Sequence, residues 1–312
     1  MINKIFKRLI ILAAFIAPIQ SYAARIDTLS VKSEKMNKKI EVVVIVPDKA
    51  INHQECPTLY LLHGYSGNAR TWINIKPELP DMADKDGIIV VCPDGENSWY
   101  WDSPTNQDSQ FETFVSKELV NYIDSNYCTV KNRNGRAITG LSMGGHGGLW
   151  LSIRHKDIFG GGGATSGGVD IRPFPNNWEM KKQLGERDTN KEVWDNHTVI
   201  TQLDKINNDD LAIIFDCGTS DFFFEVNNNL HAELLKRGIN HDYITRPGAH
   251  DGKYWNNSIE YQWLYFSKFF KCYRLTFNNC TLLYFGNKLC KFNFSLCLSS
   301  MNSFSMTYRF SI

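Results

Sequence analysis

The chain has 312 residues, enough to bury one large hydrophobic core or two small ones. Hydrophobic residues make up 43% of it and charged residues 21%, and the formal net charge at pH 7 is +1. This near-neutral balance excludes the strongly basic class of nucleic-acid binders and gives no reason to expect acidic lipid as a partner. We therefore expect an ordinary globular enzyme or binding domain.

The first 23 residues have the pattern of a secretory signal peptide. Basic residues precede an apolar run over 9–19, and Ser21-Tyr22-Ala23 follows with small residues at both ends. The apolar run is too short to cross a membrane, which takes about 20 residues. We expect cleavage after Ala23, no stable membrane span afterwards, and a periplasmic or secreted protein. An uncleaved anchor is the alternative.

Eight cysteines in an exported chain raise the question of disulfides. None forms a CxxC pair or lies near a suitably spaced histidine, so we predict no zinc site, and no other cofactor. Cys92 and Cys217 lie in strand-like runs and are expected to be small buried hydrophobes. The sequence leaves the disulfide pairing and the oligomeric state open.

Short apolar runs that end near Gly, Pro or Asp predict the strands of a buried parallel sheet. These runs cover residues 39–47, 58–62, 88–92, 136–141 and 211–217, and we expect a further strand over 241–246, HDYITR. Segments with helical spacing lie between or after them, over 111–126, 144–155, 222–237 and 254–270. The alternation predicts an α/β fold with a mostly parallel central sheet, helices on both faces, and one domain over 24–270.

Two regions depart from this pattern. Residues 168–208 contain two prolines, two tryptophans and many charges without a strand signal, and we expect an insertion that covers one end of the sheet. From Lys271 onward the chain has no Asp or Glu and is rich in Phe, Asn, Ser and Cys. We treat 271–312 as a C-terminal tail of unknown role.

One serine lies in a bed of glycines between a predicted strand and a predicted helix. The pattern Gly140-Leu141-Ser142-Met143-Gly144 is G-x-S-x-G, which arises by chance in roughly one chain in ten of this length. On a sharp strand-to-helix turn such a serine is held in a strained conformation with its Oγ presented at the carboxyl end of the sheet. The glycines leave room where side chains would collide with the neighbouring strand and helix.

A serine hydroxyl becomes a nucleophile when a base takes its proton and an acid orients that base. In α/β-hydrolases the chain order is Ser, then Asp or Glu, then His. Asp221 follows the strand predicted over 211–217, and His250 follows the next predicted strand. We predict Ser142 as nucleophile, Asp221 as acid and His250 as base.

Simpler explanations exist for several of these residues. Asp221 could serve only as the N-cap of the following helix, and Asp216 and Asp170 are rival acids. His250 could be a turn residue without a chemical role. His146 could line a pocket, although a packing role fits its position better.

An acyl-transfer site also needs hydrogen-bond donors for the oxyanion. Residues 61–68, LLHGYSGN, run from a strand into a glycine-rich loop where a backbone N–H can turn inward. The N–H of Tyr65 would act together with that of Met143, the residue after the nucleophile. We expect His63 to brace this loop rather than to take part in the chemistry.

Five segments together resemble the esterase D / feruloyl-esterase-like family of α/β-hydrolases: LYLLHGYSGN, CPDG followed by NSWYWDSP, ITGLSMGGHGG, DCGTSDFF and PGAHDGKYW. Relatives in that family include tributyrin esterases, S-formylglutathione hydrolases and family 1 carbohydrate esterases. The resemblance covers about 29–270 and excludes the tail. It implies the α/β-hydrolase fold and a metal-independent serine esterase, with the five site residues in the roles given above.

Aromatic residues near the strand ends are the candidate substrate contacts. Trp99 and Trp101 follow a strand-end Asp94, and Phe222 flanks the predicted acid. Such rings could stack on a phenolic acyl group or on a sugar ring, with core or rim packing as the alternative.

The sequence therefore predicts an exported serine carboxylesterase that acts through an acyl-enzyme on short acyl, acetyl or feruloyl-type esters, plant polysaccharide being one source. The substrate is then a small-molecule or carbohydrate ester. A thioesterase of the S-formylglutathione hydrolase type is the alternative on the same machinery, although export argues against cytosolic glutathione chemistry. A noncatalytic glycan-binding module with a vestigial site is an alternative of another class. The presence of all five site residues argues against it, because a binding module has no need of all five. A serine peptidase would commonly carry a second domain.

Overall fold

The computed structural model describes residues 24–278, 282–285 and 288–291. The predicted signal peptide, residues 1–23, and most of the predicted tail lie outside the described residues.

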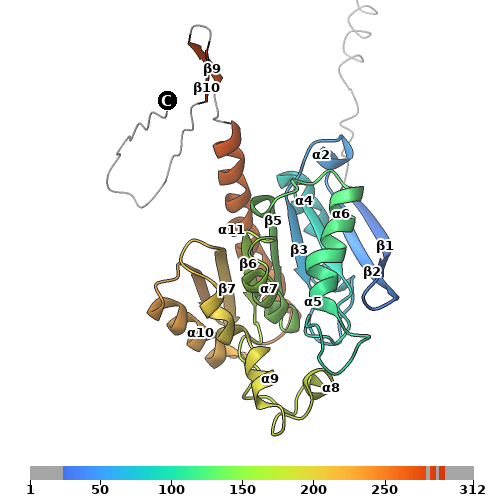
Figure 1. Ribbon diagram of the computed structural model, residues 1–312, viewed down its shortest axis with the longest axis vertical. Helices are drawn as coiled ribbons and strands as arrows, with labels where there is room; N and C mark the ends of the chain where they lie inside the picture. The colour runs from blue at the N-terminus through green and yellow to red at the C-terminus, as the bar shows by residue number, and fades with distance from the viewer. Residues whose placement is uncertain (1–23, 279–281, 286–287, 292–312) are drawn as a thin grey trace, which may run out of the picture.

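An eight-stranded sheet forms the centre of the molecule (Figure 1), with its strands in the order β1-β2-β4-β3-β5-β6-β7-β8. Strand β2 runs antiparallel to both of its neighbours, and every pair from β4 to β8 is parallel. The strands are β1 Arg25–Ser33, β2 Lys38–Val46, β3 Thr58–Leu62, β4 Ile89–Pro93, β5 Arg136–Gly140, β6 Gly161–Thr165, β7 Ala212–Gly218 and β8 Asp242–Arg246, with a separate antiparallel pair of β9 Leu282–Phe285 and β10 Lys288–Lys291. The predicted mostly parallel sheet is confirmed.

Two strands, β1 and β6, are not predicted by the sequence. Strand β1 is an edge strand whose residues are mostly exposed, so its sequence mixes polar and apolar positions. Strand β6 contains three glycines, and a Cβ at Gly162 would collide with the Ser152 side chain of the helix packed on it. The glycines of β6 are therefore explained by the close approach of this helix, and the strand has no large apolar side chains that would form a run.

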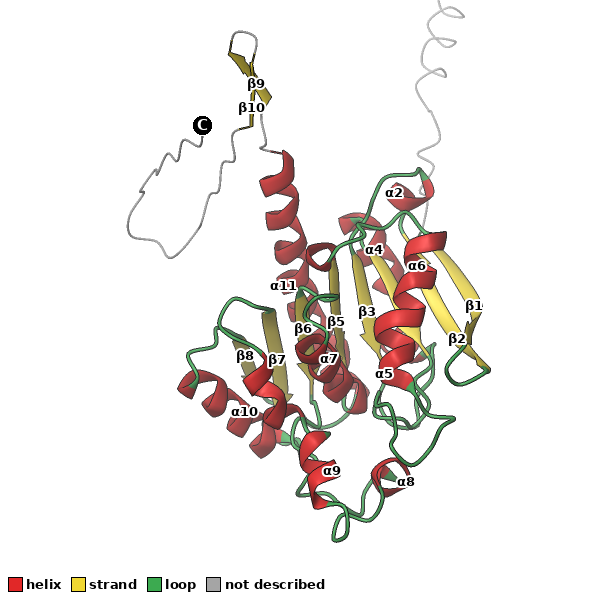
Figure 2. Cartoon of the chain, viewed as in Figure 1, coloured by secondary structure: helices red, strands yellow, loops and turns green. Residues whose placement is uncertain are grey.

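Helices cover both faces of the sheet (Figure 2), as predicted. The larger core packs α5, η1, α6, α7 and α10 on one face, and the smaller core packs α3, α4 and α11 on the other. The helices are α2 Asp48–Ile51, α3 Thr71–Ile75, α4 Leu79–Asp86, α5 Phe111–Thr113, the π-helical η1 Phe114–Leu119, α6 Val120–Asn126, the 3₁₀ turn η2 Arg133–Gly135, α7 Met143–Arg154, α8 Met180–Leu184, α9 Lys191–Asn196, the 3₁₀ segment η3 Val199–Lys205, α10 Phe224–Lys236 and α11 Gly252–Asn278. Helix α11 runs on to Asn278, beyond the end at residue 270 that its sequence predicts.

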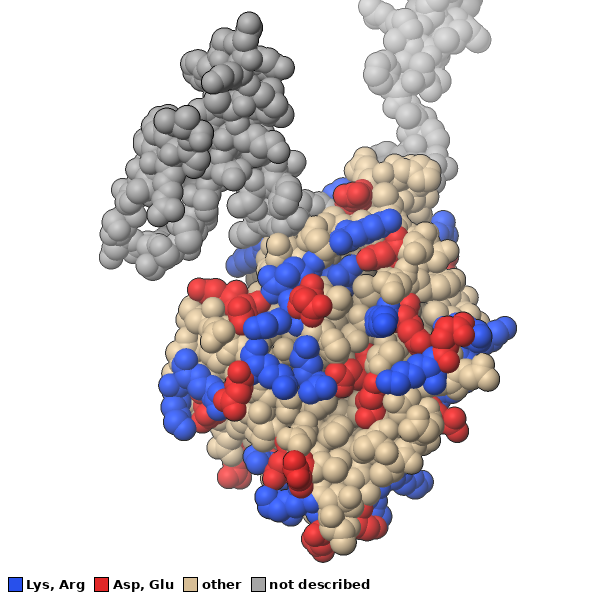
Figure 3. Space-filling view, in the orientation of Figure 1, with Lys and Arg blue, Asp and Glu red and all other residues tan. Residues whose placement is uncertain are grey.

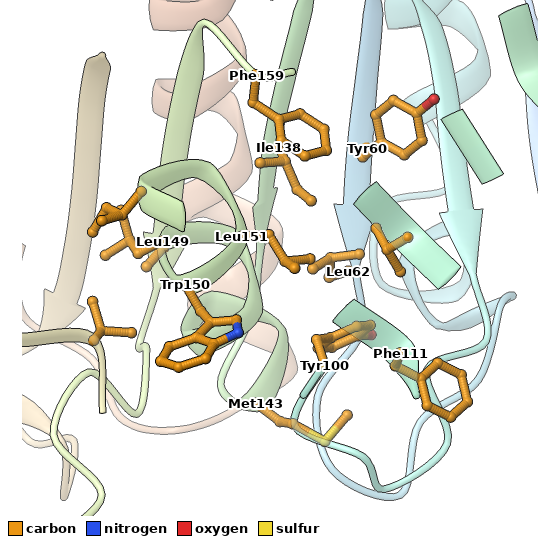
Figure 4. Close-up of a cluster of buried hydrophobic side chains, with 14 of the residues drawn as sticks. Tyr60, Leu62, Tyr100, Phe111, Ile138, Met143, Leu149, Trp150, Leu151 and Phe159 are labelled. Atoms are coloured by element: carbon orange, nitrogen blue, oxygen red, sulfur yellow. The ribbon is translucent and has the colours of Figure 1, made fainter. Parts of the chain in front are cut away.

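Helix α7 lies in the middle of the larger core, and its side chains are buried from Met143 to Ile153. Figure 4 shows Leu151 from this helix pointing towards Leu62 of β3, and both residues belong to the larger core together with Trp150. A helix enclosed on all sides cannot shift without disturbing the sheet, so the turn at its N-terminus is held by well-packed structure.

The segment over 168–208 lies beyond the carboxyl ends of the parallel strands, at the bottom of Figure 1, as predicted for an insertion over one end of the sheet. Its short helices α8 and α9 are anchored by buried Met180, Leu184 and Trp194. The insertion is therefore packed against the domain at the edge where parallel strands present their loops.

The face of the molecule in Figure 3 carries acidic and basic side chains interspersed, without a field of one sign. Among the described residues, no helix has both the length and the apolar character that crossing a membrane requires.

Candidate active site

Ser142 occupies the turn between β5 and α7 with φ +55° and ψ −117°, a conformation that non-glycine residues rarely adopt. A Cβ added at Gly140 would lie 2.5 Å from the carbonyl oxygen of Leu62, and one added at Gly144 would collide with the same backbone. The glycines around the serine are thus required because the turn presses against the end of β3. This close packing holds Ser142 in its strained conformation, with 9% of its surface exposed.

The three predicted catalytic side chains form one hydrogen-bonded chain. His250 Nε2 lies 2.9 Å from Ser142 Oγ, and His250 Nδ1 lies 2.8 Å from Asp221 Oδ2. The carboxylate side chain of Asp221 is fully buried, so it favours the tautomer that carries a proton on Nδ1. The Nε2 lone pair then faces the serine hydroxyl, as a general base requires.

Asp221 uses its second oxygen to hold a nearby backbone N–H. Its Oδ1 accepts the N–H of Phe223 at 2.8 Å, just ahead of α10. Asp221 is not the N-cap of α10, which is Phe223, and its two oxygens hold the Phe223 N–H and His250 at the same time.

Three aromatic rings surround the imidazole of His250. The ring of Phe222 lies 4.2 Å from it between centroids, and the rings of Trp255 and Phe223 meet it edge-on at 5.1 and 5.5 Å. These contacts restrict rotation of the imidazole, so the rings and Asp221 together fix its orientation.

The two rival acids are engaged elsewhere. Asp216 is fully buried on β7, where it accepts hydrogen bonds from Thr165, Ser258 and Gln262 and lies 3.5 Å from Arg246. Burial raises the pKa of this carboxyl despite those partners. Asp170 is paired with Arg172 through both of its oxygens.

The glycine-rich loop after β3 runs beside the serine. A Cβ at Gly64 would lie 3.2 Å from Ser142 Cβ, so the backbone passes close to the serine at the residue before Tyr65. Among the described residues, neither the Tyr65 N–H nor the Met143 N–H has a hydrogen-bond acceptor. Met143 begins α7, where the free N–H groups and the helix dipole favour negative charge.

His63 braces that loop, as its sequence position predicts. Its Nε2 accepts the Gly95 N–H at 2.7 Å, so Nδ1 carries the proton and donates to the carbonyl of Gly64 at 2.7 Å. The ring is buried, and it ties the loop after β3 to the loop after β4.

The structure differs from the prediction that Trp99 and Trp101 contact substrate. Their exposed fractions are 1% and 0%, because both rings pack under the insertion and stack on each other at 5.6 Å. Trp101 Nε1 donates to His146 Nε2 at 2.7 Å, and His146 Nδ1 donates to the Gly168 carbonyl at 3.0 Å. Burial lowers the pKa of His146 to about 3, so this histidine is a neutral packing residue, as predicted.

Comparison with known proteins decides the family. A family model described as "Putative esterase" matches residues 33–264. The chain belongs to this esterase family. An acetyl esterase of Caldicellulosiruptor saccharolyticus is 27% identical over 257 residues, which cover 74% of this chain and 95% of that protein. The S-formylglutathione hydrolase of Arabidopsis thaliana is 24% identical over 68% of this chain and 84% of its own length.

Solved structures agree with this assignment. A ferulic acid esterase superposes with a TM-score of 0.68 and 26% identity, over 80% of this esterase and all of the other chain. An S-formylglutathione hydrolase from Staphylococcus aureus has a TM-score of 0.70 at 20% identity, over 79% of this esterase and all of its own chain, a likeness of fold alone. The predicted α/β-hydrolase fold and esterase D / feruloyl-esterase-like family are confirmed, and this esterase is an enzyme that hydrolyses carboxylic esters.

Two residues of the insertion reach the site of this esterase without having been predicted from the sequence. The ring of Trp178 stacks on that of Phe222 at 5.6 Å, and burial together with the charge of Glu179 raises the pKa of Tyr65. The predicted contact residue Phe222 lies beside His250. The sequence signal for Trp178 was an aromatic residue in an aperiodic segment, which does not say where its ring points.

Cys92 and Cys217 are buried free thiols, as predicted, and burial raises the pKa of Cys92 to about 12. Cys128 is also a free thiol, and Cys56 is buried. The four later cysteines lie where no side chain is described. Within the described residues, no cluster of three or more His, Cys, Asp or Glu side chains is arranged to hold a metal ion.

Proposed function

We propose that this esterase is a serine carboxylesterase that works through an acyl-enzyme on Ser142. The observation that carries the proposal is the chain from Ser142 Oγ to His250 to Asp221, with hydrogen bonds of 2.9 and 2.8 Å, at the N-terminus of α7. A strained serine joined to a base and an oriented acid is the arrangement needed for nucleophilic attack on a carbonyl.

In the first half-reaction, Ser142 Oγ bonds to the carbonyl carbon while its proton passes to His250 Nε2. The carbonyl π electrons move to the oxygen, whose charge the N–H groups of Tyr65 and Met143 stabilise. The tetrahedral intermediate collapses, and the bond to the alcohol oxygen breaks. His250 returns its proton to that oxygen, so the alcohol leaves neutral and the acyl group stays on Ser142.

In the second half-reaction, a water molecule enters where the alcohol has left. His250 takes a proton from the water as its oxygen attacks the acyl carbon, and the same N–H groups receive the second oxyanion. When this intermediate collapses, the proton passes from His250 to Ser142 Oγ. A carboxylic acid is released and the enzyme is regenerated. Asp221 stays ionised and stabilises the imidazolium in both steps.

The proposed substrates are short acyl, acetyl or feruloyl-type oxygen esters. The named activities of an acetyl esterase at 27% identity and a ferulic acid esterase at 26% identity support this class. A thioesterase of the S-formylglutathione hydrolase type is the second candidate, because a protein of that name is 24% identical over 84% of its length. Both reactions use the same machinery, so only relative rates separate them.

The proposal includes export to the periplasm or the medium. It is supported by the basic, apolar and small-residue order of residues 1–23. In addition, Ala24 is buried and β1 starts at Arg25, so cleavage after Ala23 would leave the folded domain whole.

The test is hydrolysis of p-nitrophenyl acetate, p-nitrophenyl butyrate and methyl ferulate by the chain without residues 1–23 and by its Ser142→Ala variant. We expect the variant to lose roughly a thousandfold or more in kcat on each ester that the parent hydrolyses. Ser125→Ala is the matched control, because Ser125 is an exposed serine that hydrogen-bonds only within its own helix turn.

Turnover that survives Ser142→Ala would contradict the proposal. Faster turnover of S-formylglutathione than of every oxygen ester would favour the thioesterase. Inactivity on all of these substrates together with glycan binding would favour the binding module.

A further inference from the structure

Phe222 leaves a large apolar ring half in water beside the catalytic machinery. Its exposed fraction is 51%, although its ring lies 4.2 Å from that of His250 and the next residue, Phe223, is buried. When a ligand covers an apolar ring in this position, the free energy falls, since burial of apolar surface is favourable. The exposed ring therefore points to a flat apolar ligand surface in the bound state.

A fixed aromatic cluster backs this ring. Trp178 stacks on Phe222 at 5.6 Å with 25° between the ring planes, and it packs in turn on Phe174 and Phe223 at 5.5 and 5.2 Å. Trp178 and Glu179 both have positive φ, 48° and 53°, a strained turn for side chains of this size. The insertion thus holds Trp178 against the loop that carries the acid, at a cost in backbone strain.

The position beside His250 identifies which half of the ester meets the ring. During acylation, His250 Nε2 donates a proton to the leaving alcohol oxygen, whereas the oxyanion faces the N–H groups of Tyr65 and Met143. A ring packed on the imidazole consequently lies on the alcohol side of the ester.

Polar groups border the aromatic pair. Glu179 directly follows Trp178 and forms an ion pair with Lys182. The side chains of Glu179 and Lys182 are exposed, so their oxygen and nitrogen atoms can exchange partners with a ligand. A sugar ring matches this combination, because it has an apolar C–H face and a rim of hydroxyl groups. A plain aryl group would leave the polar border unused.

We infer that Phe222 and Trp178 form a platform for the alcohol half of the substrate, and that this half is a sugar ring. The inference rests on the proposed function and adds to it the side of the ester on which the specificity lies.

The experiment compares two acetate esters that differ only in the alcohol, acetylated methyl β-xyloside and ethyl acetate, by pH-stat. Phe222→Ala and Trp178→Ala should each lower the ratio of kcat/KM for the sugar ester to that for ethyl acetate by about tenfold, the loss expected from one ring contact. Phe222→Tyr keeps a flat ring and should hold the ratio within about twofold of wild type. Leu235→Ala is the control, because Leu235 is an exposed apolar residue on α10 outside the site.

The half-reaction that is affected gives an independent readout. Because the alcohol has left before water attacks, the loss in Phe222→Ala should fall on acylation, measured as the pre-steady-state rate of alcohol release. A loss confined to deacylation would overturn the inference by assigning the platform to the acyl half.

Three further results would overturn it. Equal losses on both esters would mean that Phe222 only supports His250. A ratio that falls for p-nitrophenyl acetate against ethyl acetate, but not for the sugar ester, would assign the platform to aryl alcohols. A wild type that hydrolyses ethyl acetate without favouring the sugar ester would refute the platform alone, whereas inactivity on every ester would refute the proposed function as well.

Discussion

Asp221 divides its carboxylate between a backbone N–H and the catalytic histidine. Oδ1 accepts the Phe223 N–H and Oδ2 meets His250 Nδ1, each at 2.8 Å. The hydrogen bond from the Phe223 N–H prevents the acid from rotating, so the second oxygen is held at the imidazole before substrate arrives. Asp216, five positions earlier on β7, has an equally buried carboxylate but is occupied by α11 and β6.

This difference gives a paired prediction. Asp221→Asn should lower kcat on p-nitrophenyl acetate by roughly 10³ to 10⁴-fold, because an amide neither holds the required histidine tautomer nor stabilises the imidazolium. Asp216→Asn makes the same chemical change, but it should mainly lower the stability, by about 3 kcal/mol, as Arg246 loses its buried partner. Steady-state kinetics and thermal unfolding measured on both variants would refute these roles if the kcat losses were equal.

His146 links stability to pH, because burial lowers its pKa from 6.5 to about 3 in the folded state. Between these values the unfolded chain binds a proton that the folded chain does not. The contribution of His146 is therefore complete above pH 6.5 and is lost as the pH falls towards 3.

We predict that protonation of His146 in the unfolded chain lowers the free energy of unfolding by up to about 1.4 kcal/mol for each pH unit between pH 6.5 and about 3. Urea unfolding at a series of pH values should give a shallower pH slope for His146→Gln than for wild type. The slope should shrink rather than vanish, because burial also lowers the pKa of His197. Parallel curves for the two proteins would contradict the assignment.

At the scale of elements, glycines set how closely α7 packs on the sheet. A Cβ at Gly148 would collide with the Gly163 carbonyl of β6 and lie 2.9 Å from the Thr139 Cα of β5. Both obstacles are backbone atoms, which cannot move aside as a flexible side chain can. The glycines that follow Ser142 thus serve the sheet as well as the turn.

Gly148→Ala should lower the unfolding free energy by about 1–3 kcal/mol, the cost of overpacking a core. Gly252→Ala is the matched control, because a Cβ there meets nothing within 4 Å, and its change should stay within about 0.5 kcal/mol. Denaturant unfolding measures both. Equal stability of the two variants would show that α7 can move off the sheet.

The elements also show what the sequence could predict. Buried strands need continuous apolar runs, and β2, β3, β4, β5 and β7 were predicted by that signal. Strand β8 was predicted from HDYITR, which is not such a run. Strand β6 carries its signal in missing side chains, and β1 is half exposed at an edge, so neither has such a run. Ser142, Asp221 and His250 could be predicted as a group because the carboxyl ends of parallel strands meet at one edge of the sheet. Trp178 could not, because its position depends on the path of an aperiodic insertion.

Aromatic residues close to the site were harder to predict than the catalytic ones. Trp99, Trp101 and Phe222 have the same appearance in the sequence, a ring just after a strand-end loop. Only the packing of the insertion buries the first two and leaves the third exposed. Burial of this kind depends on contacts distant in sequence, which local patterns do not contain.

In the whole molecule, two cores on opposite faces of one sheet support a site built at the carboxyl ends of β5, β7 and β8. The insertion lies over the same end of the sheet. The N-terminal strand β1 is an edge strand, at the opposite end of the strand order from β8. A cut after Ala23 therefore keeps the site and every described residue of both cores, including the buried Ala24.

We predict that the protein recovered from an export-competent bacterial host begins at Ala24. The small residues at Ser21 and Ala23 fit the signal-peptidase pattern, and the cut falls one residue before β1. N-terminal sequencing of the periplasmic or secreted fraction measures this directly. Protein that keeps Met1 and remains in the membrane fraction would instead indicate an uncleaved anchor.

The central claim is that Ser142 carries the acyl group during turnover, and one measurement tests it most directly. The chain without residues 1–23 is quenched in acid during hydrolysis of p-nitrophenyl butyrate, digested, and mapped by mass spectrometry. We predict a butyryl group on the peptide that contains Ser142, and none in the Ser142→Ala variant. An acyl group on another residue, or turnover without any acylated peptide, would contradict this account.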